Sequence, residues 1–91
     1  MIIEFYSTLR LELGIKRTTL EIKDGITVEE LLHRLSKETD YNVYEKLVKD
    51  GKPITGTNIL INGKNFHHLE KLQTKLRNSD LVQIFPPAAG G

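Results

Sequence analysis

The fold is decided by residues 26–35, which read ITVEELLHRL. Thr27 and Glu30 have the spacing of a capping box, in which each side chain accepts a hydrogen bond from the other residue's backbone N–H, so a helix is predicted to begin after Thr27. Apolar residues then recur at intervals of three and four, at Val28, Leu31, Leu32 and Leu35. We therefore expect one face of this helix to be buried and the other to be exposed to solvent.

Short alternating or apolar runs on both sides of this helix predict strands. They cover residues 2–7, 18–23, 58–61 and 81–85, and Asn62-Gly63 after the third run is the strongest hairpin signal in the chain. Two early strands joined by a short link form an antiparallel pair, and a helix between strands crosses one face of a sheet. The order predicts an α+β protein with the β-grasp (ubiquitin-like) fold, a mixed sheet of four or five strands packed on one main helix.

The sequence does not determine the secondary structure of three connecting segments as clearly. Leu9, Leu11 and Leu13 fit a continued strand and an irregular turn equally well. Residues 43–50 fit a short second helix that ends at Asp50-Gly51, and residues 64–77 are basic and only weakly periodic. We expect residues 1–85 to form the β-grasp domain and residues 86–91 to form an extended C-terminal tail.

Composition excludes several classes of function. The chain has 91 residues, no cysteine and a formal net charge of +1, a length that suits one small domain with little room for an internal active site. The absence of cysteine excludes disulfides, thiolate metal ligands and a cysteine nucleophile. No apolar run is long enough for a membrane span or a signal peptide, so we expect a cytoplasmic protein with no membrane partner. The mild net charge does not favour nucleic acid as a partner.

The last six residues, Pro86-Pro87-Ala88-Ala89-Gly90-Gly91, carry the clearest functional signal. The two prolines restrict the backbone and direct the chain away from the last strand, and the small residues that follow suit a narrow tunnel in a partner protein. The C-terminal carboxylate is ionised at neutral pH, since its pKa is about 3.3–3.7. It is therefore able to attack the α-phosphate of a nucleotide and form an acyl-adenylate.

Several segments resemble the MoaD family, the sulfur carriers that form the small subunit of molybdopterin synthase. They are residues 58–63 (NILING), residues 72–76 (LQTKL), the turn before Asp80, and above all the ending VQIFPPAAGG at residues 82–91. The resemblance runs over essentially the whole chain, although Asn78-Ser79-Asp80 stands where the family usually has a glycine before the aspartate. Residues 40–57 look longer than in short bacterial members and more like those of archaeal members.

The resemblance implies a specific chemistry at Gly91. An E1-like activating enzyme adenylates Gly91 with ATP, and a sulfur donor converts it to a thiocarboxylate. The tail (Pro86, Pro87, Ala88, Ala89, Gly90, Gly91) then enters the large subunit of molybdopterin synthase, where sulfur passes to precursor Z. The chain itself is expected to bind no cofactor and no metal and to supply no catalytic side chain, because the resemblance assigns the zinc to the activating enzyme.

A partner interface is predicted from the alternation of side chains along the strands. If Val82 and Ile84 face the core, Leu81 and Phe85 face the other way, and Tyr6 shares that outward register. Parallel pairing of the first and last strands, usual in this fold, brings Tyr6 close to Phe85. We expect Phe66 to complete this apolar interface, the alternative being that one or more of these residues caps a small satellite core. His67-His68 lacks a third ligand nearby, so the pair does not predict a metal site.

Other functions compete with the carrier role. The first alternative is a ubiquitin-like protein modifier that is joined through Gly91 to lysines, or a sulfur carrier that also serves tRNA thiolation. A carrier for thiazole synthesis is less favoured, because those chains are usually shorter and lack the Phe-Pro-Pro ending. A non-covalent binding module predicts that deletion of Gly90 and Gly91 leaves function intact.

Overall fold

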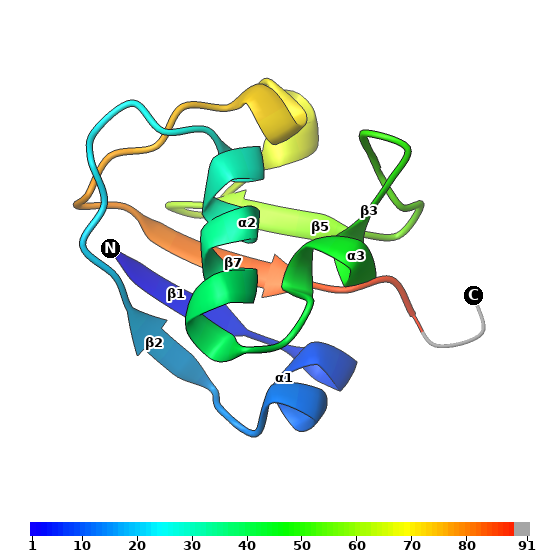
Figure 1. Ribbon diagram of the computed structural model, residues 1–91. Coiled ribbons are helices and arrows are strands. Elements are labelled where there is room, and N and C mark those ends of the chain that lie inside the picture. Colours follow the sequence, from blue (N-terminus) through cyan, green and yellow to red (C-terminus); the bar gives the residue numbers. More distant parts are fainter. Residues whose placement is uncertain (89–91) are drawn as a thin grey trace.

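The helix predicted after Thr27 organises the computed structural model, which describes residues 1–88. Helix α2 (Val28–Thr39) begins with the expected capping box: the Glu30 N–H donates to Thr27 Oγ1 at 3.1 Å, and the Thr27 N–H donates to Glu30 Oε1 at 3.0 Å. It lies across one face of a sheet (Figure 1). All four residues of its apolar stripe are fully buried, namely Val28, Leu31, Leu32 and Leu35.

The main sheet has five strands in the order β2-β1-β7-β5-β6, with the last strand of the chain at its centre. The strands are β1 (Ile2–Phe5), β2 (Arg17–Thr19), β5 (Asn58–Ile61), β6 (Lys64–Asn65) and β7 (Leu81–Phe85). Strand β1 runs parallel to β7 and antiparallel to β2, and β5 runs antiparallel to both β7 and β6. This confirms the α+β class, the mixed sheet and the parallel pairing of the first and last strands.

The remaining elements are short and cover the ends of the sheet. They are α1 (Ser7–Leu13), α3 (Val43–Leu47), a small hairpin of β3 (Val48–Lys49) and β4 (Lys52–Pro53), and two 3₁₀ helices, η1 (Phe66–His68) and η2 (Lys71–Gln73). The ambiguous leucine segment is thus a helix, ended by Gly14 in the left-handed region at φ 74°. None of the helices in residues 1–88 has the length and apolar character needed to cross a membrane.

Three expected elements differ from the structure. The first strand ends at Phe5 rather than Ser7, because Ser7 has φ 57° and begins α1. The second strand ends at Thr19 rather than Lys23, because beyond the Ile2–Thr19 pair the chain is held by other bonds: the Leu20 N–H donates to the Met1 carbonyl, and the Ile22 N–H donates to Asn78 Oδ1 at 2.9 Å. The expected second helix ends at Leu47, and Asp50-Gly51 instead turns the β3–β4 hairpin.

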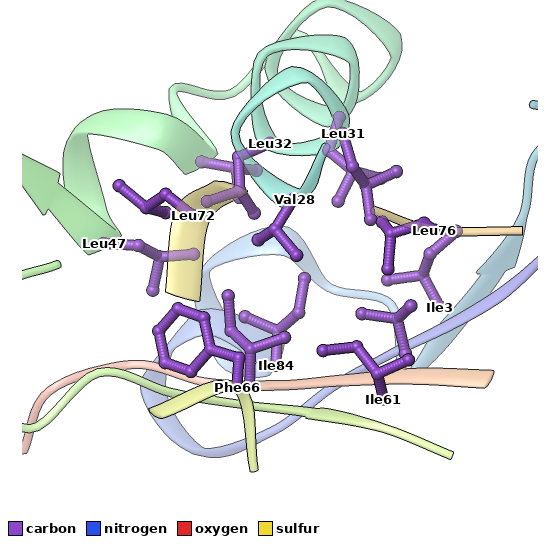
Figure 2. Close-up of a cluster of buried hydrophobic side chains, with 14 of the residues drawn as sticks. Ile3, Val28, Leu31, Leu32, Leu47, Ile61, Phe66, Leu72, Leu76 and Ile84 are labelled. Atoms are coloured by element: carbon purple, nitrogen blue, oxygen red, sulfur yellow. The ribbon is translucent and has the colours of Figure 1, made fainter. Parts of the chain in front are cut away.

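The core lies between α2 and the inner face of the sheet. Figure 2 shows Val28, Leu31 and Leu32 of α2 pointing toward Ile3, Ile61 and Ile84 of the strands. Leu47 of α3, Leu72 of η2 and Leu76, which lies in the loop after η2, are labelled in the same cluster. Because every second strand residue enters this core, the alternate residues of β1, β7 and β5 lie on the opposite face, which no helix of the described chain covers.

Candidate functional site: the tail root and the open face of the sheet

The described part of the tail, residues 86–88, leaves the centre of the sheet, and we call it the tail root. Strand β7 pairs with β1 on one side and β5 on the other as far as Phe85, which faces Asn58 of β5. Pro86 and Pro87 follow and have no backbone N–H, so they cannot extend the ladder. Both prolines are half-buried, and Ala88 is exposed. Ala89, Gly90 and Gly91, which carry the predicted chemistry, lie outside the described residues.

Tyr6 and Phe85 meet beside the tail root, as the alternation of strand residues predicts. Their rings are stacked, with 4.4 Å between the ring centroids and 14° between the ring planes. The two residues come from the adjacent ends of β1 and β7, where the Tyr6 N–H donates to the Ile84 carbonyl at 3.1 Å. Both side chains are half-buried. The pair presents an aromatic surface directly before the prolines.

A polar network extends this surface along the open face. The carboxylate of Glu4 accepts hydrogen bonds from Arg17 (Nε, 3.1 Å), Gln83 (Nε2, 2.9 Å) and Tyr6 (Oη, 3.0 Å). Gln83 Nε2 also donates to Tyr6 Oη at 3.1 Å. The hydrogen bonds from Arg17, followed by those from Gln83 and Tyr6, lower the pKa of the Glu4 carboxyl. The network therefore holds an ionised carboxylate at neutral pH and fixes the Tyr6 ring against Phe85.

Leu81 also lies on the open face, but at the far end of β7 from Phe85. Its register partner on β1 is Ile2, and 40 % of the Ile2 residue surface is exposed. Leu60 of β5 faces Gln83 between the two ends. We call the set Ile2, Glu4, Tyr6, Arg17, Leu60, Leu81, Gln83 and Phe85 the open-face patch. It places apolar residues at both ends of a polar network, and it contains tyrosine, phenylalanine and arginine, which are enriched in protein–protein interfaces.

The prediction that Phe66 belongs to this interface is wrong. Phe66 is fully buried in the core on the helix side of the sheet, near Leu47 and Ile84 (Figure 2). Strand β6 has only two residues, and Asn65 Oδ1 then accepts a hydrogen bond from the His67 N–H at 2.9 Å, which starts the 3₁₀ turn η1. In the β5–β6 register Asn65 pairs with outward-facing Leu60, so the next residue, Phe66, falls on the core face where the turn begins.

The histidines after Phe66 do not form a metal site in the part of the chain described. Within residues 1–88 no group of three or more His, Cys, Asp or Glu side chains is arranged to hold a metal ion. His67 has a structural contact instead, because its Nε2 lies 2.9 Å from the Thr57 carbonyl oxygen and is placed to donate to it.

Glu4, Arg17 and Gln83 belong to the site although the sequence alone does not single them out. The alternation in β1 and β7 places Glu4 and Gln83 on the outward face. Because both are polar, an interface predicted from its apolar residues does not include them. Arg17 joins them only through the antiparallel register of β1 and β2, in which Glu4 faces Arg17. The signal is a charged pair on neighbouring strands, which becomes visible once the register is known.

Comparison with known proteins places the chain in a family. The model of the ThiS family matches residues 3–91. Small archaeal modifier protein 3 of Haloferax volcanii is 35% identical over 89 residues, which are 98% of this chain and 96% of that protein. An Archaeoglobus fulgidus protein whose name proposes it as a sulfur carrier is 36% identical over 84 residues, which are 91% of this chain and 96% of that protein.

A solved structure agrees with the fold. The solution structure of small archaeal modifier protein 1 from Methanosarcina acetivorans superposes with a TM-score of 0.77 at 31% identity, over 99% of this chain and 94% of that one. The β-grasp fold expected from the order of elements is therefore confirmed. From its match over nearly its whole length and from these relatives, we conclude that the chain belongs to the ThiS family of small ubiquitin-like proteins.

Proposed function

We propose that the chain is a sulfur carrier whose reactive group is the carboxylate of Gly91. In the proposed sequence the carboxylate attacks the α-phosphorus of ATP in an E1-like enzyme, pyrophosphate leaves, and a hydrosulfide ion from the sulfur donor then displaces AMP from the acyl carbon and loses its proton. The product is a thiocarboxylate at Gly91. ATP acts as a substrate of the activating enzyme, so the chain itself needs no bound cofactor.

One observation carries this proposal: a central strand of the sheet ends at Phe85, and Pro86 and Pro87 follow it in the sequence that leads to Gly90-Gly91. A central strand is held on both sides by hydrogen bonds, so it gives the tail a fixed starting point. The reacting end lies six residues beyond Phe85, a reach of about 20 Å when extended. This length allows the domain to dock on an enzyme surface while Gly91 enters the active site.

The open-face patch is the proposed docking surface for the activating enzyme and for the acceptor protein. Tyr6 and Phe85 lie next to the tail root, so a partner that covers them also receives the tail. The Glu4–Arg17 pair gives the same surface a polar contact that fixes orientation. Since one surface serves both partners, their binding is expected to be mutually exclusive.

We propose that the carrier acts as the small subunit of molybdopterin synthase. The support is the Phe-Pro-Pro-x-x-Gly-Gly ending at residues 85–91, which resembles the MoaD family. In this role the thiocarboxylate tail enters the large subunit and transfers sulfur to precursor Z. The test is reconstitution: the thiocarboxylated chain, the large subunit and precursor Z should give the dithiolene product, whereas a chain that lacks Gly91 should give none.

A protein-modifier role is the second candidate, and the names of two relatives favour it. In this role a lysine amine of a target protein, rather than a sulfur nucleophile, accepts the Gly91 acyl group. Trypsin cleaves after Arg77, so a conjugate would leave residues 78–91 attached to the modified lysine of the target. Mass spectrometry of tryptic peptides from cells that express the tagged chain distinguishes the two roles, because the carrier role leaves no such branched peptides.

A further inference from the structure

The tail root rests against the turn that connects β4 to β5. This turn spans residues 54–57, and the Thr57 N–H donates to the Ile54 carbonyl at 2.9 Å to close it. Its third residue, Gly56, has φ +96°, a backbone region that favours glycine and is required at this place in a type II turn. A Cβ added to Gly56 would lie 3.4 Å from Pro87 Cα and 3.5 Å from Pro87 Cβ.

The turn is fixed to the domain from both of its ends. The Ile54 N–H and the Thr57 hydroxyl both donate to the Leu47 carbonyl, at 2.8 and 3.1 Å. Thr57 is buried, and its own carbonyl accepts from His67 Nε2 at 2.9 Å. Because these bonds fix the turn to α3 and to η1, Gly56 is held rigidly beside the tail root.

A different side of the tail root is open. A cavity of about 230 Å³ lies between residues 86–88 and a wall formed by Thr8, Leu9, Glu12 and Lys46. Lys46 Nζ lies 3.5 Å from Glu12 Oε2 and joins α3 to α1 beside it. Gly56 does not line this cavity. The tail root therefore lies against the turn on one side and borders the cavity on the side of α1, which Figure 1 shows near the end of β7.

We propose that Gly56 is a positioning residue that sets the direction in which the tail leaves the domain. This role rests on the proposed function, because it determines where Gly91 arrives when the open-face patch is docked. The turn lies against Pro87, the two prolines restrict the backbone around it, and a Cβ at position 56 would already be in van der Waals contact with Pro87, so that atoms beyond Cβ have little room on this side. A larger side chain at position 56 would displace Pro87 toward the cavity.

The test compares two glycines with nearly the same φ. Gly25 has φ +99°, and a Cβ added there would have no atom within 4 Å, whereas Gly56 has φ +96° and a Cβ added there would lie 3.4 Å from Pro87 Cα. Gly56→Leu and Gly25→Leu should thus lose similar stability through the backbone. Only Gly56→Leu should lower the kcat of ATP-dependent adenylation by the E1-like enzyme of the same cell, by at least about 10-fold, since a displacement of about 1 Å at a reacting group can cost 10²-fold.

The KM for the chain should stay unchanged in Gly56→Leu, because the open-face patch is intact; a loss confined to kcat separates positioning from general damage to the fold. An NMR contact between the α protons of Gly56 and the Pro87 ring should be present in the wild-type chain and in Gly25→Leu, and lost in Gly56→Leu. Equal kcat values for the two variants, or absence of this contact in the wild type, overturn the positioning role. A wild-type chain that is not adenylated refutes the proposed function, and with it the positioning role, whatever the NMR contact shows.

Discussion

Replacement of Phe66 by alanine tests the division between core and docking surface. Phe66 is fully buried, and truncation of a buried phenylalanine to alanine costs about 3–5 kcal/mol. A small domain has about 5–15 kcal/mol of stability in total. The variant is therefore expected to lose a large part of its free energy of unfolding while its docking surface stays intact wherever it remains folded.

Urea denaturation followed by far-UV circular dichroism measures this loss, since the chain has no tryptophan to report by fluorescence. For a slope of about 1 kcal/mol per molar urea, the midpoint should fall by about 3 M or more. Leu69→Ala is the control: this residue lies three positions later with 40 % of its surface exposed, and its truncation should cost about 0.5 kcal/mol. If Phe66→Ala is too unstable to purify, Phe66→Leu gives a smaller loss that is still measurable. A loss below about 1 kcal/mol together with weaker binding to the activating enzyme would refute the core assignment.

Further substitutions test the site and its scaffold. Phe85→Ala should weaken binding to the activating enzyme by about 10-fold or more if the stack is an interface anchor, which titration calorimetry measures; unchanged affinity would remove this residue from the docking surface. Glu4→Gln should destabilise the chain at neutral pH, because hydrogen bonds from Arg17, Gln83 and Tyr6 lower the pKa of Glu4 in the folded chain. The contribution of ionised Glu4 to the free energy of unfolding is present above the unfolded pKa of about 4.3. It is lost as the pH falls through the folded pKa. Denaturation curves should hence converge with wild type in acid, and a constant difference at all pH values would contradict this. Ser7 has φ +57°, so Ser7→Gly should raise the free energy of unfolding by up to about 1 kcal/mol; a decrease would show that the left-handed backbone is not strained there. Thr27→Ala removes the capping box and should cost about 1 kcal/mol, and an unchanged thermal midpoint would argue against that cap.

The elements that sequence predicts well are those determined by neighbouring residues. The capping box of Thr27 and Glu30 fixes where α2 begins, and Asn62-Gly63 turns the β5–β6 hairpin with both residues at positive φ. The stacking of Tyr6 on Phe85 follows from alternation along two strands and the parallel register between them. In each case the physical signal lies within a few neighbouring residues or depends on the register of a single pair of strands.

The features that sequence misses depend on contacts between distant segments. Phe66 lies in a stretch that is only weakly periodic, and its place on the core face follows from the pairing of Asn65 with outward-facing Leu60, a register that the sequence does not reveal. Asn78, in the Asn78-Ser79-Asp80 turn, accepts hydrogen bonds from the Met1 ammonium and the Ile22 N–H, which lie 77 and 56 positions away. Gly56 looks like an ordinary turn glycine until the tail is found against it.

The most direct test of the central claim is the intact mass of the chain after incubation with the E1-like enzyme, ATP and a sulfur donor. Replacement of one carboxylate oxygen by sulfur at Gly91 adds about 16 Da. We predict this gain in the wild-type chain, its dependence on ATP, and its absence from a chain shortened by Gly91. An unchanged mass in the presence of an activating enzyme that still consumes ATP with this chain would contradict the carrier role, and branched peptides on target lysines in the same cells would then assign the chain to protein modification.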